Sequence, residues 1–185
     1  MPAPYPPALR VRIAALNRFS RHDPHDPLVR DVVRQRAVDA CEYCLMPTNG
    51  KFEIEHIVPK RRWNDYLNNA YPGLRRAERL ALPTYDHILN FAWSCSYCND
   101  AKGGRPRPRI HTRVFDPRFD HWPDHFAFSS TKGYIVIVGL TAVGHETVRT
   151  MGFHAGGEEG ALVERSTAIQ RGLYPPSWLR IAYNL

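Results

Sequence analysis

The chain has 185 residues and a mass of 21.3 kDa, with 43% hydrophobic and 23% charged residues and a formal net charge of +7 at pH 7. This size and composition predict one domain of ordinary size with a buried core, and they exclude a globally disordered chain. The most apolar window, residues 134–140, is too short to span a bilayer, and the first residues lack the apolar stretch of a secretory signal. We therefore expect a cytoplasmic protein with no membrane partner.

The positive charge is concentrated in the first part of the chain. Residues 1–113 contain 19 Lys and Arg against 11 Asp and Glu, whereas residues 114–185 contain 6 against 7. This asymmetry favours a polyanionic partner for the first part, and a basic surface that serves only solubility is the alternative.

Pro, Arg and His are frequent in residues 1–27, which predict an N-terminal arm with a short helix around residues 11–17. Asp26 and Pro27 then have the pattern of an N-cap followed by a first-turn proline. The apolar spacing that follows predicts a helix from residue 28 to about residue 40.

Alternating apolar residues predict a strand over residues 51–58, which Pro59 ends. Residues 60–89 are polar with a few apolar anchors, so we expect irregular structure or short helices there. Two of the anchors, Trp63 and Tyr66, are interpreted as core residues, with base stacking as the alternative.

The basic stretch 101–113 predicts an exposed linker. A strand is predicted over residues 134–138, and Thr141 is expected to cap a helix that reaches Met151. A further helix is predicted over residues 159–171, ending at Gly172.

All four cysteines occur in two pairs of the same spacing, Cys41-x-x-Cys44 and Cys95-x-x-Cys98. Four thiolates in two such pairs are the tetrahedral ligand set of a structural zinc ion, which leaves no open position for chemistry. Two disulfides or four unrelated buried thiols are the alternatives, and a cytoplasmic setting disfavours disulfides.

Two short motifs bring metal ligands and a titratable base close to these pairs. Glu55 and His56 lie near the end of the predicted strand, so a carboxylate ligand stands beside an imidazole that can accept a proton near neutral pH. Asn90 precedes Cys95, and Asn99 follows Cys98. If a helix begins at the second pair, Asn99 and Lys102 lie on one face of it.

The combination resembles an HNH endonuclease of the His-Me finger (ββα-metal) group, in the branch that carries zinc knuckles. The residues that carry the resemblance are the two cysteine pairs, the Glu55-His56-Ile57-Val58-Pro59 strand, Asn90 and the Cys98-Asn99-Asp100-Ala101-Lys102-Gly103 segment. Residues 114–176 also resemble a C-terminal extension of stand-alone bacterial HNH proteins.

The resemblance implies an α+β fold, with a ββα-metal core stapled by a four-cysteine zinc site, flanking helices and a small C-terminal α/β extension. Together with the composition along the chain, it predicts three regions: an arm at 1–27, a nuclease core at 28–113, and an extension packed on that core at 114–185.

The resemblance assigns a role to each catalytic candidate. His56 is similar to the general base that activates the attacking water, and Glu55 and Asn99 match the ligands of a catalytic Mg²⁺, Mn²⁺ or other divalent ion. Asn90 matches the asparagine that braces the loop and orients the histidine. Glu55 stands where many members have Asp.

The implied activity is metal-dependent hydrolysis of DNA phosphodiester bonds, in restriction, phage defence or mobile-element biology. Double-stranded DNA is the expected partner, no small-molecule cofactor is expected, and a double-strand cut would suggest a homodimer. Basic residues near the motif are predicted phosphate contacts, with solvated surface charge as the alternative for each one: Lys60, Arg61, Arg62, Lys102, Arg105, Arg107 and Arg109.

Three interpretations stay open from the sequence. The first is an active endonuclease, the second a zinc-stapled nucleic-acid-binding module without activity, and the third a structural subunit that contacts a nucleoprotein. The joint presence of Glu55, His56, Asn90 and Asn99 favours the first. His121 and His125 have the spacing of a metal pair on a helix, but a second metal site is not the favoured interpretation.

Overall fold

The computed structural model describes residues 7–16, 21–47, 51–70, 84–104, 113–131, 134–153, 164–165 and 167–177. It is a mixture of helices and small antiparallel sheets, which confirms the α+β class. Contacts divide the chain into two units, which interleave in sequence. Unit 1 is built from Asp39–Glu53 and Ser94–Leu185, and unit 2 from Ala3–Val38 and Ile54–Trp93. The three regions expected from the sequence stay a prediction.

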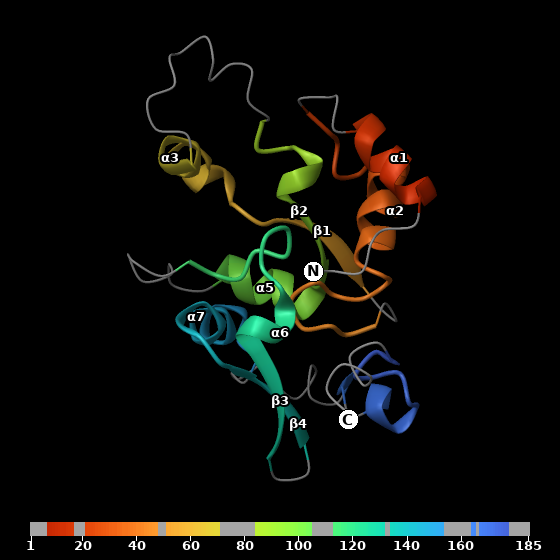
Figure 1. Ribbon diagram of the computed structural model, residues 1–185, viewed down its shortest axis with the longest axis vertical. Coiled ribbons are helices and arrows are strands. Elements are labelled where there is room, and N and C mark those ends of the chain that lie inside the picture. Colours follow the sequence, from red (N-terminus) through yellow and green to blue (C-terminus); the bar gives the residue numbers. More distant parts are fainter. Residues whose placement is uncertain are drawn as a thin grey trace. The chain divides into compact units, whose positions relative to one another are not determined.

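Two helices that pack side by side begin unit 2, α1 (Pro7–Leu16) and α2 (Pro27–Arg36) (Figure 1). The Asp26 side chain accepts hydrogen bonds from the backbone N–H groups of Leu28 and Val29, which confirms the predicted cap. The helix ends at Arg36, earlier than the predicted end near residue 40, because Val38 and Asp39 have left-handed φ values of 53° and 55°.

Strands β1 (Phe52–His56) and β2 (Phe91–Cys95) form a two-stranded sheet. The N–H of Ile57 donates to the carbonyl of Asn90, and the N–H of Ser96 donates to the carbonyl of Lys51, so the strands are antiparallel. A strand is thus confirmed within residues 51–58, but it ends at His56, and its burial does not follow the predicted alternation, because Phe52 and Glu55 are its buried residues.

Helix α3 (Lys60–Ala70) follows Pro59 directly, where the sequence predicted irregular structure or short helices. A short 3-10 helix, η1 (Ile88–Asn90), then leads into β2. Helix α5 (Ser96–Gly104) begins immediately after β2, so the start of the predicted basic linker is helical. The rest of that linker, residues 105–112, lies outside the described residues.

The C-terminal part of unit 1 is a hairpin covered by a helix (Figure 1). After the single turn α6 (Trp122–His125), strands β3 (Phe126–Thr131) and β4 (Tyr134–Gly139) pair antiparallel, with Phe126 opposite Gly139. Helix α7 (Ala142–Met151) packs on β4. A Cβ at Gly144 would lie 2.0 Å from the carbonyl oxygen of His125, so only glycine permits this approach.

The two predicted helix ends in this region are confirmed where they are described. Thr141 Oγ1 accepts from the N–H of Gly144 and caps α7. Residues 167–170 are helical, and Gly172, with a φ of 69°, follows them. In the part of the chain that the structure describes, no helix has the length and apolar character needed to cross a membrane.

Each unit buries its own apolar side chains. In unit 1, the Phe126 ring meets Phe115 edge-on and lies tilted against Trp122, with ring centroids 5.2 and 5.0 Å away. In unit 2, the fully buried Val32 and Val33 on α2 and Phe91 on β2 belong to the core.

Candidate functional site

The first cysteine pair lies in a tight backbone turn of unit 1. The N–H of Cys41 donates to the carbonyl of Met46 at 2.7 Å, and the N–H of Leu45 donates back to the carbonyl of Cys41 at 2.8 Å. Leu45 takes a left-handed φ of 62° to close the turn. The reversal brings Cys41 and Cys44 into the interior, where both are buried.

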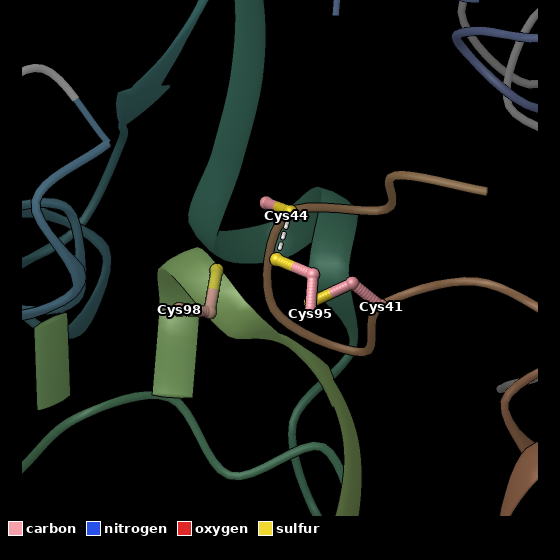
Figure 2. Close-up of side chains that lie close together, drawn as sticks. All are labelled: Cys41, Cys44, Cys95 and Cys98. Carbon is pink, nitrogen blue, oxygen red and sulfur yellow. Dashed lines mark hydrogen bonds between the residues drawn. The ribbon is translucent and has the colours of Figure 1, made fainter. Parts of the chain in front are cut away.

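The second pair completes a cluster of four sulfurs. Cys95 ends β2 and Cys98 lies in the first turn of α5. All four Sγ atoms lie within 4.8 Å of one another, and those of Cys44 and Cys95 are 3.7 Å apart (Figure 2). The alternative of four unrelated buried thiols is therefore wrong.

The cluster fits a tetrahedral metal ion. With Zn–S bonds of about 2.3 Å, tetrahedral sulfurs are about 3.8 Å apart, close to the observed Cys44–Cys95 separation. The four thiols are free, so they do not form the two disulfides considered as an alternative. These four residues could therefore hold a metal ion such as zinc.

The protonation of the cysteines reflects their crowding. Contacts with the sulfurs of Cys41 and Cys44 raise the pKa of Cys95 and of Cys98 well above the usual thiol range. Burial alone would raise the pKa of Cys41 too, but hydrogen bonds from the other three sulfurs lower it well below that range. Without a metal ion, the cluster therefore favours a thiolate at Cys41 beside protonated thiols. A bound cation would allow all four cysteines to be thiolates, because it neutralises their negative charge.

Residues of the C-terminal part hold the first turn in place. The indole N–H of Trp122 donates to the carbonyl of Tyr43 at 2.9 Å, and the hydroxyl of Tyr174 donates to the carbonyl of Cys44 at 3.3 Å. Arg118 pairs with Glu42, and both side chains are largely buried. Sequence reasoning missed these contacts, because they join residues more than seventy positions apart.

The second cluster lies in unit 2 around His56, at the end of β1. Its Nε2 is 3.0 Å from Oδ1 of Asp86. The Tyr85 ring stacks on the imidazole with centroids 4.8 Å apart, and the Phe91 ring meets it edge-on at 5.1 Å. Only 25% of the His56 side chain is exposed, so the ring is held by neighbours on several sides.

Asn90 joins the two backbone segments that flank His56. Its Oδ1 accepts from the N–H of Val58 at 2.8 Å, and its Nδ2 donates to the carbonyls of Val58 and Tyr85 at 3.0 and 2.8 Å. The amide is therefore hydrogen-bonded through both its nitrogen and its oxygen. These hydrogen bonds are of the kind that a residue bracing the loop would make. The catalytic role of Asn90 stays a prediction.

A buried arginine from α2 supports the same segment. Arg36 donates to the carbonyls of Ile88 and Phe91 at 3.1 and 2.6 Å, on either side of Asn90. Sequence reasoning missed Arg36 and Asp86. Arg36 has the helical spacing of an ordinary surface residue, and Asp86 lies in a segment without periodicity.

The predicted ligands of the catalytic metal belong to different units. Glu55 lies in unit 2 and is buried, with 9% of its surface exposed. Asn99 lies on α5 in unit 1, where its Nδ2 donates to Oε2 of Glu53 at 2.6 Å. That Glu55 and Asn99 share a metal ion stays a prediction.

The predicted phosphate contacts are described only in part. Lys60 Nζ lies over the Tyr85 ring, 5.3 Å from its centroid, and Lys102 Nζ lies over the Tyr43 ring at 5.7 Å. Arg62 is half-buried on α3. Arg61 also lies on α3, but its side chain is outside the described part of the chain. Three further predicted contacts lie wholly outside the described residues: Arg105, Arg107 and Arg109.

His121 and His125 have separate partners. His121 Nδ1 is 3.4 Å from Asp124 Oδ1, whereas His125 Nδ1 is 2.7 Å from Thr141 Oγ1. Within the described ranges, the four cysteines are the single group of three or more His, Cys, Asp or Glu side chains close enough to share a metal. Trp63 is half-buried on α3, and the side chain of Tyr66 lies outside the described part.

Comparisons of the chain with protein-family models, with curated proteins and with solved structures found no match.

Proposed function

We propose that this protein is a metal-dependent endonuclease of the HNH type that hydrolyses DNA phosphodiester bonds. The observation that carries the proposal is the His56 cluster. A histidine at the end of β1 is flanked by segments that Asn90 ties together through three hydrogen bonds. The chain order β1, α3, η1, β2 and α5, with Cys95 at the end of β2 and Cys98 in the first turn of α5, supports the proposal of a ββα-metal core.

His56 is the residue that acts on the water in this proposal. Its imidazole accepts a proton from the attacking water, and the hydroxide attacks the scissile phosphorus to leave a 5′-phosphate and a 3′-hydroxyl. A divalent cation, when bound, would stabilise the negative charge that develops on the phosphate and the leaving oxygen. The resemblance gives Glu55, through its carboxylate, and Asn99, through its amide oxygen, as the expected ligands of such a cation. Because Asn99 uses its nitrogen to bind Glu53, its oxygen can serve as the ligand.

The cysteine cluster has a separate, structural part in the proposal. Four sulfurs complete the coordination of zinc and leave no position for water or substrate. Zinc there would hold the turn of Cys41 and Cys44 against the start of α5, the helix that carries Asn99.

The net charge of +7 supports a polyanionic substrate. Phosphate contacts from basic residues would position DNA without selecting its sequence. Because each neutralised duplex phosphate steepens the salt dependence by about 0.9 log unit per log unit of salt, affinity should fall strongly as salt rises.

The first experiment incubates the purified protein with supercoiled plasmid and Mg²⁺ or Mn²⁺. The wild type should convert the plasmid to open-circular or linear DNA, and omission of the divalent ion should prevent this. His56→Ala should lower the rate by about 10²–10⁴-fold, the usual contribution of a general base. His25→Ala is the matched control, since His25 is an exposed histidine of the same unit.

Each alternative outcome points to a different conclusion. Intact plasmid with salt-dependent gel shifts would support the inactive nucleic-acid-binding module instead. Equal cleavage by wild type and His56→Ala would show that another group activates the water.

A further inference from the structure

His56 and Asp86 form a close pair, and the carboxylate of Asp86 determines which ring nitrogen of His56 carries a hydrogen. The Nε2 of His56 lies 3.0 Å from Oδ1 of Asp86. The Asp86 side chain is 9% exposed. An ionised carboxylate only accepts hydrogen bonds, so the ring nitrogen that faces it must carry a hydrogen. In the neutral imidazole the second nitrogen, Nδ1, then carries the lone pair.

We infer that Asp86 is a positioning residue that fixes neutral His56 in the tautomer protonated at Nε2 and so makes Nδ1 the atom that takes the proton from water. This inference rests on the proposed function, because it assigns the reacting atom of the proposed base. The proton that leaves water forms a bond to Nδ1, and the resulting imidazolium donates from Nε2 to the Asp86 carboxylate.

Asp86 is held from both its side chain and its backbone. Its second oxygen, Oδ2, is 3.3 Å from Nε of Arg21, and its carbonyl accepts from the N–H of His22 at 2.6 Å. The adjacent Tyr85 carbonyl accepts from Asn90, and the Tyr85 ring stacks on His56. The carboxylate and the imidazole are therefore fixed by overlapping contacts, as a geometry that selects one tautomer requires.

A positioning role and a merely structural role predict different measurements. If Asp86 only stabilised the fold, its replacement would lower the free energy of unfolding without changing which ring nitrogen carries the hydrogen. If Asp86 positions the base, its replacement changes the tautomer in protein that is still folded. The ¹⁵N chemical shifts of a histidine ring distinguish a protonated nitrogen from one with a lone pair.

The test records these shifts for the full chain labelled with ¹⁵N-histidine, at a pH at which the imidazoles are neutral, with His56→Ala to assign the signals. The wild type should show Nε2 protonated and Nδ1 with the lone pair. Asp86→Ala should populate the other tautomer. Arg21→Ala is the matched control, because it removes the contact to Oδ2 and leaves the bond between Asp86 and His56.

Turnover on plasmid provides the second readout. Asp86→Asn should lower kcat by about 10²–10⁴-fold with little change in KM, since it disturbs the base and not DNA binding. Asp86→Glu should recover part of the rate because it restores a carboxylate. Circular dichroism and thermal melting confirm that the variants are folded.

The two readouts separate the failure of this inference from that of the nuclease proposal. A wild-type ring protonated at Nδ1, or a tautomer unchanged in Asp86→Ala, would overturn the positioning role even if the protein cuts DNA. Intact plasmid with the wild type would overturn the nuclease and the catalytic part of the inference. The ¹⁵N signals would still decide whether Asp86 sets the tautomer.

Discussion

A single amide organises the backbone around the candidate base. Asn90 bonds both the N–H and the carbonyl of Val58 and also the carbonyl of Tyr85. It is 4% exposed, so water cannot easily replace these partners. An asparagine is suited to this place because one side chain offers both donors and an acceptor.

Replacement of Asn90 should therefore destabilise unit 2. Asn90→Ala leaves backbone groups of Val58 and Tyr85 without their partner and should lower the free energy of unfolding by about 1–3 kcal/mol. Asn90→Asp keeps an acceptor for Val58 but loses both donated bonds, so it should also destabilise. Urea denaturation measures both changes. Asn64→Ala, on the exposed side of α3, is the control and should change stability by no more than about 0.5 kcal/mol.

The residue scale also shows the limit of sequence reasoning. His56 could be selected as a base from its place beside Glu55 and before Pro59. Its partner Asp86 could not, because the two residues are 30 positions apart and no periodicity relates them.

A stability change in Asn90→Ala as small as in Asn64→Ala would contradict the bracing role.

At the scale of elements, the end of α2 sets the direction in which the chain enters the cysteine turn. The helix begins at its predicted cap, because Asp26 is a local signal. It ends early because Val38 and Asp39 adopt left-handed backbone angles. No residue at this point is a glycine, so the sequence shows no stop.

This backbone conformation gives a prediction about stability. A left-handed conformation costs an L-residue about 1–2 kcal/mol, whereas the greater freedom of unfolded glycine costs about 0.5–1 kcal/mol. Val38 has a φ of 53° and is 67% exposed, so little packing is lost on truncation. Val38→Gly should thus raise the free energy of unfolding by about 0.5–1 kcal/mol in urea denaturation.

Ala37→Gly is the matched control for Val38→Gly. Ala37 has a right-handed φ of −76°, so glycine there gains no relief of strain and should destabilise by up to about 1 kcal/mol. Equal destabilisation by the two glycines would show that Val38 is not strained.

Helix α3 is a regular helix in a segment for which the sequence predicted irregular structure or short helices. Its residues are mostly polar, and only a few, such as Trp63 and Leu67, mark an apolar face. These two are four residues apart, a helical spacing, but one pair in a long polar segment is a weak signal.

At the scale of the whole molecule, the cysteine cluster joins parts of the chain that are far apart in sequence. It links the turn at Cys41 and Cys44 to the start of α5, and α5 contacts α7. The binding free energy of a structural metal is coupled to folding, because a chain that is unfolded has no preformed site.

Removal of the metal should therefore destabilise the protein. We expect one zinc ion per chain by atomic absorption. Extraction with a strong chelator, or Cys98→Ser, should lower stability by roughly 3 kcal/mol or more, which corresponds to a fall in Tm of about 6–12 °C. Ser96→Ala, between the two cysteines of the second pair, should keep the zinc. A chain that purifies without zinc and melts at the same temperature with and without chelator would contradict a structural metal.

The sequence by itself determined the features that depend on neighbours along the chain. The Cys-x-x-Cys spacing within each pair indicated a metal-ligand turn, the Asp26-Pro27 pair marked the start of α2, and apolar alternation indicated a strand at β1. Each depends on the local geometry of a turn, a helix or a strand, which a few consecutive residues specify.

Only the tertiary structure decided which distant groups meet. The carboxylate of Asp86 beside His56, the buried Arg36 at the carbonyls that flank Asn90, and the Trp122 indole on Tyr43 join residues 30 to 79 positions apart. Such contacts follow from the path of the whole chain and from the need to satisfy every buried polar group, and no short pattern encodes either of these.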